Sequence, residues 1–119
     1  MNGIYIAARY ARRTEAEALA QCLEARGRRV TSTWHDGHHE RRGSLTPGED
    51  LSDEAMWAKE DLFDLSRAAV LVSLTELPGV GSRGGRHFEA GYALGLGLAW
   101  IAIGPPESTV FYRLADRRF

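Results

Sequence analysis

Four short apolar runs, separated by polar or amphipathic segments, recur along this chain of 119 residues. The candidate strands are Ile4–Ala8, Val30–Trp34, Val70–Leu74 and Trp100–Ile103. The run Val70–Leu74 is apolar and rich in β-branched residues, which is typical of a central parallel strand buried on both faces. The pattern therefore predicts a sheet of about four strands.

Apolar residues at helical spacing fill the intervals between these runs. The first predicted helix ends at Gly27, a residue suited to a left-handed cap, and two further helices cover about 52–67 and 86–96. Ser52 is placed to cap the second helix. The segment 108–119 is compatible with one short helix or with an extended end.

Strands that alternate with helices at this spacing predict right-handed βαβ units and an α/β fold, an open parallel sheet with helices on both faces. We expect one domain over residues 1–119 and the strand order 2-1-3-4. In such sheets, ligands bind beyond the carboxyl ends of the strands where the order reverses, here between the first and third strands. The loops 9–14 and 75–85 would then frame the site.

Composition narrows the possible functions. The hydrophobic content of 44% and the charged content of 26% are those of a soluble globular protein. Neither a membrane-spanning run nor a signal peptide is recognisable, so we expect a cytoplasmic protein without a membrane partner. The net charge of −1 provides no field for a nucleic-acid polymer, and the single cysteine, Cys22, excludes an internal disulfide and a multi-cysteine zinc site.

The polar stretch 35–50 opens with the cluster His35-Asp36-Gly37-His38-His39-Glu40. Imidazoles and carboxylates bind zinc, but the cluster lacks the helical His-Glu-x-x-His spacing. We therefore interpret it as a polar loop, expect no metal, and note that a loop of this length can close over a substrate.

The segment 82–93, Ser-Arg-Gly-Gly-Arg-His-Phe-Glu-Ala-Gly-Tyr-Ala, carries the main chemical signal. Glycines before a helix permit close approach of a ligand, and the free amides at a helix start favour an anion such as phosphate. The pattern is neither a Walker loop nor a dinucleotide fingerprint, which disfavours an ATPase or a dehydrogenase. The alternative is a glycine-rich turn with solvated arginines, in which Glu89 complements the helix dipole.

This segment, together with Glu60-Asp61-Leu62 before 68–74 and the opening Ile4-Tyr5-Ile6-Ala7, resembles the nucleoside 2-deoxyribosyltransferase-like superfamily over nearly the whole chain. That superfamily includes deoxyribosyltransferases and 2′-deoxynucleoside 5′-monophosphate N-glycosidases, and its fold is flavodoxin-like. The resemblance implies a small-molecule nucleoside or nucleotide as substrate and no metal or organic cofactor. It also implies a homo-oligomer, often with a neighbour's C-terminal region completing the pocket.

By this resemblance, Glu89 is the nucleophile that attacks C1′ and displaces the base, as the carboxylate of a retaining glycosidase does. Asp61 orients the sugar or helps to protonate the leaving base, and the Tyr5 hydroxyl holds the Glu89 carboxylate. The residues alone leave two alternatives open: Asp61 as a solvated helix acid and Tyr5 as a core residue.

The predicted substrate-binding residues follow the first, second and third strands: Ala8, Arg9, Trp34, Ser82, Arg83, Gly84 and Gly85. Arg9 and Arg83 stand where nucleotide-cleaving relatives use small or hydroxyl residues for a 5′-phosphate. The arginines can strengthen phosphate binding or pair with nearby acids. Trp34 can stack on a base or fill the core.

We therefore expect an enzyme that cleaves the N-glycosidic bond of a 2′-deoxynucleoside or its 5′-monophosphate and passes the sugar to another base or to water. The first alternative is a nucleotide-binding module that has lost turnover. A weaker one is a structural protein that binds partners through its sheet edge or helices.

Overall fold

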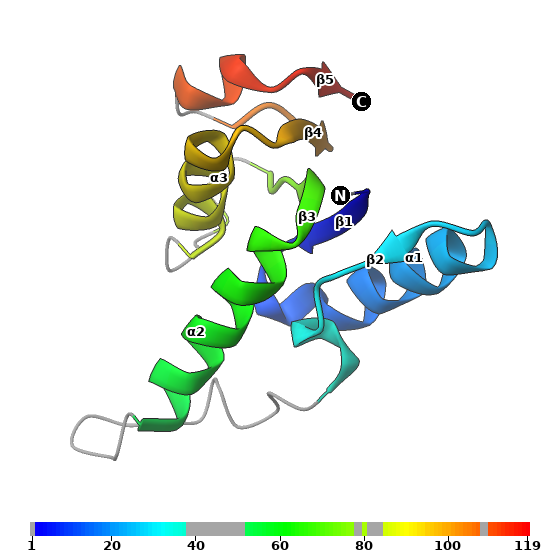
Figure 1. Cartoon of the computed structure of the whole chain (residues 1–119). Coiled ribbons are helices and arrows are strands. Elements are labelled where there is room, and N and C mark those ends of the chain that lie inside the picture. Colours follow the sequence, from blue (N-terminus) through cyan, green and yellow to red (C-terminus); the bar gives the residue numbers. More distant parts are fainter. Residues whose placement is uncertain (1, 38–51, 78–79, 81–84, 108–109) are drawn as a thin grey trace.

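The structure is a computed structural model that describes residues 2–37, 52–77, 80, 85–107 and 110–119 (Figure 1). In chain order the elements are β1 (Gly3–Ala7), η1 (Tyr10–Arg12), α1 (Arg13–Ala25), β2 (Arg29–Val30), η2 (Trp34–Asp36), α2 (Ser52–Ser66), β3 (Ala68–Leu74), α3 (Gly85–Leu96), β4 (Ala99–Ile103), η4 (Val110–Leu114) and β5 (Arg117–Arg118). Every strand pair is parallel, and the order is β2-β1-β3-β4-β5. The predicted α/β fold and the order 2-1-3-4 are confirmed, with a fifth strand added.

Helices lie on both faces of this sheet. The chain passes from β1 to β2 in one direction along the sheet and from β3 to β4 in the other, so right-handed crossovers place α1 and α3 on opposite faces. Helix α2 packs beside α3 (Figure 1). None of the described helices has the length and apolar content needed to cross a membrane.

The second strand is shorter than predicted, ending at Val30 instead of Trp34. The Thr31 amide still donates to the Ile4 carbonyl at 2.8 Å. Beyond Thr31, side chains replace the backbone ladder: the Ile6 amide donates to Ser32 Oγ at 3.1 Å, and the Trp34 indole N–H donates to the Ile6 carbonyl at 2.7 Å. The backbone polar groups of β1 are thus satisfied without a strand, so the chain is able to turn into η2.

A chain of polar contacts runs from the buried Ser32 and His35 to the partly exposed Glu17 and fixes η2 to α1. His35 Nε2 lies 2.8 Å from Ser32 Oγ, and its Nδ1 lies 2.8 Å from Glu17 Oε2. The order of groups is that of a hydrolytic triad, but Ser32 is buried and its oxygen already accepts the Ile6 amide. The trio therefore serves the fold. Residues 38–40 of the histidine cluster lie outside the described residues.

The end of the chain combines both forms expected for 108–119: the 3₁₀ turn η4 and then the strand β5. Arg117 and Arg118 pair with Ile101 and Ala102 of β4. Asp116 Oδ2 accepts the Trp100 amide at 2.8 Å, which anchors the start of β5 to β4.

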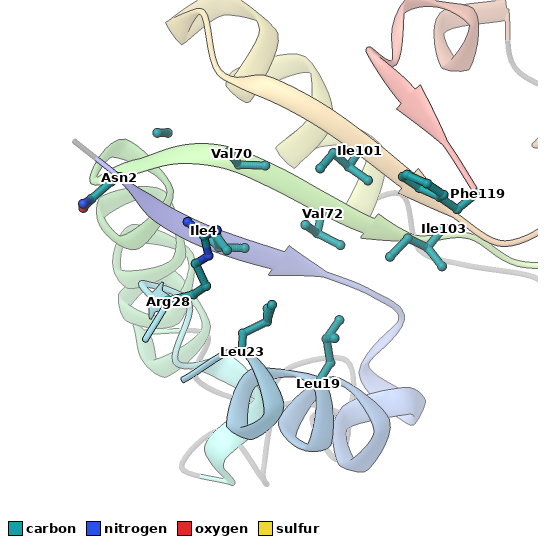
Figure 2. A pocket seen from close by; sticks show the side chains of 11 residues that line it. Asn2, Ile4, Leu19, Leu23, Arg28, Val70, Val72, Ile101, Ile103 and Phe119 are labelled. Carbon is teal, nitrogen blue, oxygen red and sulfur yellow. The ribbon is translucent and has the colours of Figure 1, made fainter. Parts of the chain in front are cut away.

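An apolar groove of about 560 Å³ lies between α1 and the sheet (Figure 2). Figure 2 shows Leu19 and Leu23 of α1 on one side and the side chains of Ile4, Val70, Val72, Ile101 and Ile103 on the other, with Phe119 at one end. This groove belongs to the α1 face, so it is not the crevice in which the site is expected.

Candidate active site

Tyr5 and Glu89 meet at the place where the strand order reverses. Tyr5 lies on β1 and is fully buried, and Glu89 lies in the second turn of α3 and is partly buried. The Tyr5 hydroxyl donates a hydrogen bond to Glu89 Oε2 across 84 residues of sequence. The contact expected between them is present, while their catalytic roles stay predictions.

The environment of Tyr5 brings Asp61 into the same site. The pKa of the Tyr5 phenol is raised well above 10.0, first by burial, then by the negative charges of Glu89 and Asp61, the hydrogen bond to Glu89 and the charge of Asp64. Tyr5 is therefore a neutral hydrogen-bond donor at physiological pH. Asp61 is partly buried and its Oδ1 atom is buried, so it is not the fully solvated helix acid that the sequence left open.

Helix α2 is held in place by Thr33 and by Asp64, one turn after Asp61. Thr33 Oγ1 lies 2.7 Å from Asp64 Oδ2 and 3.0 Å from Glu60 Oε1. The other oxygen of Asp64 accepts from Arg67 Nη2 at 3.4 Å. These contacts use both oxygens of Asp64 for the fold, and they fix the part of α2 that carries Asp61.

Glu76 ties together the two loops that frame the crevice. Its Oε1 atom lies 3.3 Å from Arg9 Nε and 3.4 Å from Arg12 Nη1, and Arg12 also donates to the Thr75 carbonyl at 2.8 Å. Arg9 thus pairs with an acid, one of its two expected roles, while its side chain stays 39% exposed. Arg12 and Glu76 were not among the predicted site residues, although their positions in the two predicted loops were a usable signal.

The start of α3 is fixed by a buried ion pair that the sequence did not reveal. Arg86 Nη1 lies 2.6 Å from Glu107 Oε1 and 2.6 Å from the Tyr112 hydroxyl. The same Glu107 oxygen accepts the Glu76 amide at 2.9 Å. The alternative of solvated arginines therefore does not hold for Arg86, because its side chain connects α3 to the loop after β4 and to η4.

The remaining predicted binding residues fall into three groups. Ala8, partly buried, lies just past β1, and Gly85 begins α3 on an exposed turn. Trp34 is only 3% exposed, donates a hydrogen bond to the Ile6 carbonyl of β1 and packs near Tyr10 and His35. Of its two expected roles, these contacts correspond to filling the core and not to stacking on a base. The other three, Ser82, Arg83 and Gly84, lie outside the described residues, and their phosphate contacts stay predictions.

Among the described residues, no three His, Cys, Asp or Glu side chains form a group that could hold a metal ion.

No protein-family model matches the chain, and no curated protein matches it significantly. Among solved structures, the CMP N-glycosidase BcmB of Clostridium botulinum aligns with a TM-score of 0.61 and 18% sequence identity. The alignment covers 99% of this chain and 88% of that chain. At this identity the similarity shows the fold, and the flavodoxin-like α/β fold expected from the sequence is confirmed.

Proposed function

We propose that this chain is an enzyme that cleaves the N-glycosidic bond of a nucleoside or its 5′-monophosphate, with Glu89 as the nucleophile. The observation that carries the proposal is the hydrogen bond from the buried Tyr5 phenol to the Glu89 carboxylate. This pair lies at the switch point of a parallel sheet, where ligands of such folds bind. The motif around Glu89 and the fold shared with a CMP N-glycosidase support the same chemistry.

The reaction has two displacements at C1′ of the sugar. In the first, a Glu89 carboxylate oxygen bonds to C1′ while the C1′–N bond breaks, and the base leaves with the bonding electron pair and takes up a proton. In the second, water or another base attacks C1′, loses a proton and releases the Glu89 carboxylate. The sugar configuration is retained after two inversions.

Tyr5 and Asp61 have distinct parts in this scheme. The neutral Tyr5 hydroxyl orients Glu89 and favours its ionised form, because a donor hydrogen bond stabilises a carboxylate. Asp61, close enough to raise the pKa of the same phenol, accepts hydrogen bonds from sugar hydroxyls or delivers the proton to the leaving base.

The phosphate of a nucleotide substrate is assigned to the basic side of the crevice. Arg9 is partly exposed there and shares Glu76 with Arg12, so a bound phosphate would compete with Glu76 for the guanidinium groups. By the family resemblance, Arg83, Gly84 and Gly85 are further residues proposed to bind this phosphate. A preference for 5′-monophosphates over nucleosides is the expected outcome.

The test is base release from a panel of ribo- and 2′-deoxyribonucleosides and their 5′-monophosphates, followed by chromatography with and without an acceptor base. Glu89→Gln keeps the size of the side chain, and we expect it to reduce base release by about 10³-fold or more. Glu24→Gln, an exposed carboxylate on α1, is the matched control and should keep full activity. Equal rates for wild type and Glu89→Gln would exclude the nucleophile.

A covalent intermediate gives an independent measurement. Incubation with a 2′-fluorinated substrate should add the mass of the fluorosugar, or its phosphate, to the intact protein and localise it to the peptide containing Glu89. Substrate binding by calorimetry without base release or adduct from any member of the panel would instead identify a binding module without turnover.

A further inference from the structure

The apolar groove between α1 and the sheet has the properties of a second binding site (Figure 2). Its volume of about 560 Å³ is within the range of small-molecule sites. Nine of the eleven described residues that line it are apolar, and the two polar ones are Asn2 and Arg28. The groove therefore suits a ligand that is mainly apolar and has one polar group.

The sheet surface in this groove is of a kind that proteins normally cover. Parallel strands are usually packed on both faces, and their side chains are apolar for that reason. Helix α1 packs against β1 and β2, while α2 and α3 lie on the opposite face. On the α1 face, Val70 of β3 and Ile101 and Ile103 of β4 thus stay partly exposed. A ligand that fills the groove removes this apolar surface from water, which is favourable.

The two polar residues mark one end of the groove. Side chains alternate along a strand, and Ile4 pairs with Val30, so residue 28 lies on the same face of the sheet as both. Figure 2 shows the Arg28 side chain extending toward Ile4, with Asn2 at the same end of the groove and Phe119 at the other. The groove is therefore polar at one end and apolar along the rest of its length.

Arg28 brings a positive charge to this end without a compensating acid. Four arginines elsewhere in the described chain each contact a carboxylate: Arg9, Arg12, Arg67 and Arg86. Arg28 is exposed and forms no ion pair with any described residue. A guanidinium group presents a planar fork of N–H donors that matches a carboxylate. The charge at this end of the groove therefore complements an anionic head group.

We propose that this groove binds a free anionic amphiphile with a single alkyl chain, a fatty-acid-like carboxylate. The carboxylate pairs with Arg28, and the side-chain amide of Asn2 supplies a further donor at the same end. The alkyl chain lies between α1 and the sheet, so that it passes Ile4 and Leu23 first and reaches Phe119 last.

The register of the strands fixes the length of chain that the groove accommodates. From Ile4 to Phe119 the path crosses three strand spacings of about 4.8 Å, because the strand order runs β1-β3-β4-β5. It also advances four residues, or about 13 Å, since Ile4 is level with Ala99 and Phe119 is level with Ile103. The diagonal is roughly 19 Å, which about fifteen carbons span at roughly 1.3 Å per methylene.

This groove and the candidate active site lie back to back on the sheet. Ile4 and Tyr5 are neighbours on β1, and their side chains point to opposite faces. Tyr5 faces Glu89, whereas Ile4 lines the groove. The proposal therefore does not rest on the proposed catalysis, and its test needs no nucleotide.

The test is calorimetric titration of the full chain with dodecanoate, with methyl NMR spectra to locate the ligand. We expect saturable binding with a dissociation constant on the order of 0.1 mM. The methyl signals of Ile4, Leu23 and Ile101 should shift, while those of Ala90 and Ala93 on α3 stay unchanged. No saturable binding up to 2 mM, the outcome if a second copy or another polypeptide covers the groove, would overturn the proposal, as would shifts confined to α3.

Arg28→Gln tests recognition of the head group, with Arg29→Gln as the matched control. Arg29 is also exposed, but it pairs with Gly3 and so belongs to the opposite face of the sheet. We expect Arg28→Gln to weaken dodecanoate binding about three- to tenfold and to leave dodecanol binding unchanged, and Arg29→Gln to change neither. An unchanged affinity of Arg28→Gln for dodecanoate, or equal binding of dodecanoate and dodecyltrimethylammonium by wild type, would refute the assignment.

Chain length tests the path to Phe119. Because each buried methylene is favourable, affinity should rise at least about threefold for each pair of methylenes from octanoate to tetradecanoate, and then level off at octadecanoate. Phe119 is 75% exposed, so Phe119→Gln leaves the core intact; it should weaken tetradecanoate binding and leave octanoate binding unchanged. An affinity that keeps rising beyond tetradecanoate, or one that is independent of chain length, would contradict a groove of this length.

Discussion

Replacing Tyr5 by phenylalanine tests the electrostatics of the site without disturbing its packing. The substitution removes one oxygen from a fully buried ring and with it the hydrogen bond to the Glu89 carboxylate. A hydrogen bond to a charged group contributes about 1.5–3 kcal/mol, and the partial exposure of Glu89 favours the lower end because water can replace the donor. We expect Tyr5→Phe to lower the free energy of unfolding by about 1.5–2 kcal/mol at pH 7.

The pH dependence gives the sharper part of this prediction. Burial and the neighbouring carboxylates raise the pKa of folded Tyr5 above 10.0, so above pH 10 the unfolded chain loses a proton that the folded chain keeps. Stability then falls as pH rises, by up to about 1.4 kcal/mol per pH unit, whereas below pH 10 both states are protonated and Tyr5 adds no pH dependence. The advantage of wild type over Tyr5→Phe should therefore disappear within about 1.5 pH units above 10.

Urea denaturation at pH 7, 9, 10, 10.5, 11 and 11.5, followed by fluorescence of the three tryptophans, measures both effects. The pKa of Tyr112 is also raised by burial, but Tyr112 is present in both proteins and cancels in the difference. Stability curves of wild type and variant that stay parallel from pH 9 to 11 would show that the Tyr5 pKa is not raised, and the assignment of the three carboxylates around it would be wrong.

Two further substitutions test how the edge of the sheet supports β1. Ser32→Ala removes the oxygen that accepts the Ile6 amide and contacts His35, and leaving that buried amide without an acceptor should cost about 1–3 kcal/mol by urea denaturation; an unchanged midpoint would mean that water reaches the amide. Gly3→Ala places a Cβ atom 2.3 Å from Thr31 Cγ2, so it should destabilise the fold by about 1–3 kcal/mol. A neutral result for Gly3→Ala would show that the buried Thr31 side chain turns away freely.

The sequence predicted those elements whose formation depends on apolar periodicity. The strands β1, β3 and β4 and the three helices lie within one or two residues of their predicted bounds. A buried strand must be apolar along its length, and a helix that covers a sheet must be apolar on one face, so both are marked in the sequence. The strand β2 was overestimated, since Ser32 and Trp34 use side chains where a strand uses backbone. The strand β5 consists of two exposed arginines, so no apolar signal marks it.

The contacts of the site were also predictable only in part. Tyr5 and Glu89 could be brought together from the order of the strands and from the motif, since both place them at one switch point. The ion pair between Arg86 and Glu107 joins residues 21 apart, and that between Arg9 and Glu76 joins residues 67 apart. Such pairs have no periodicity, so only the packed structure reveals that they connect the loops around the crevice.

The negative charge around the buried Tyr5 phenol is difficult to attribute to folding alone. Asp64 has a structural role, because it binds Thr33 and Arg67. A buried tyrosine can satisfy its hydroxyl with a backbone carbonyl, without any charge in the core. Placing Glu89 there instead, with Asp61 near it, concentrates negative charge where like charges repel, an arrangement that proteins keep mainly at functional sites. Neutralising Glu89 should therefore cost far more activity than stability, and that contrast distinguishes an active site from a structural cluster.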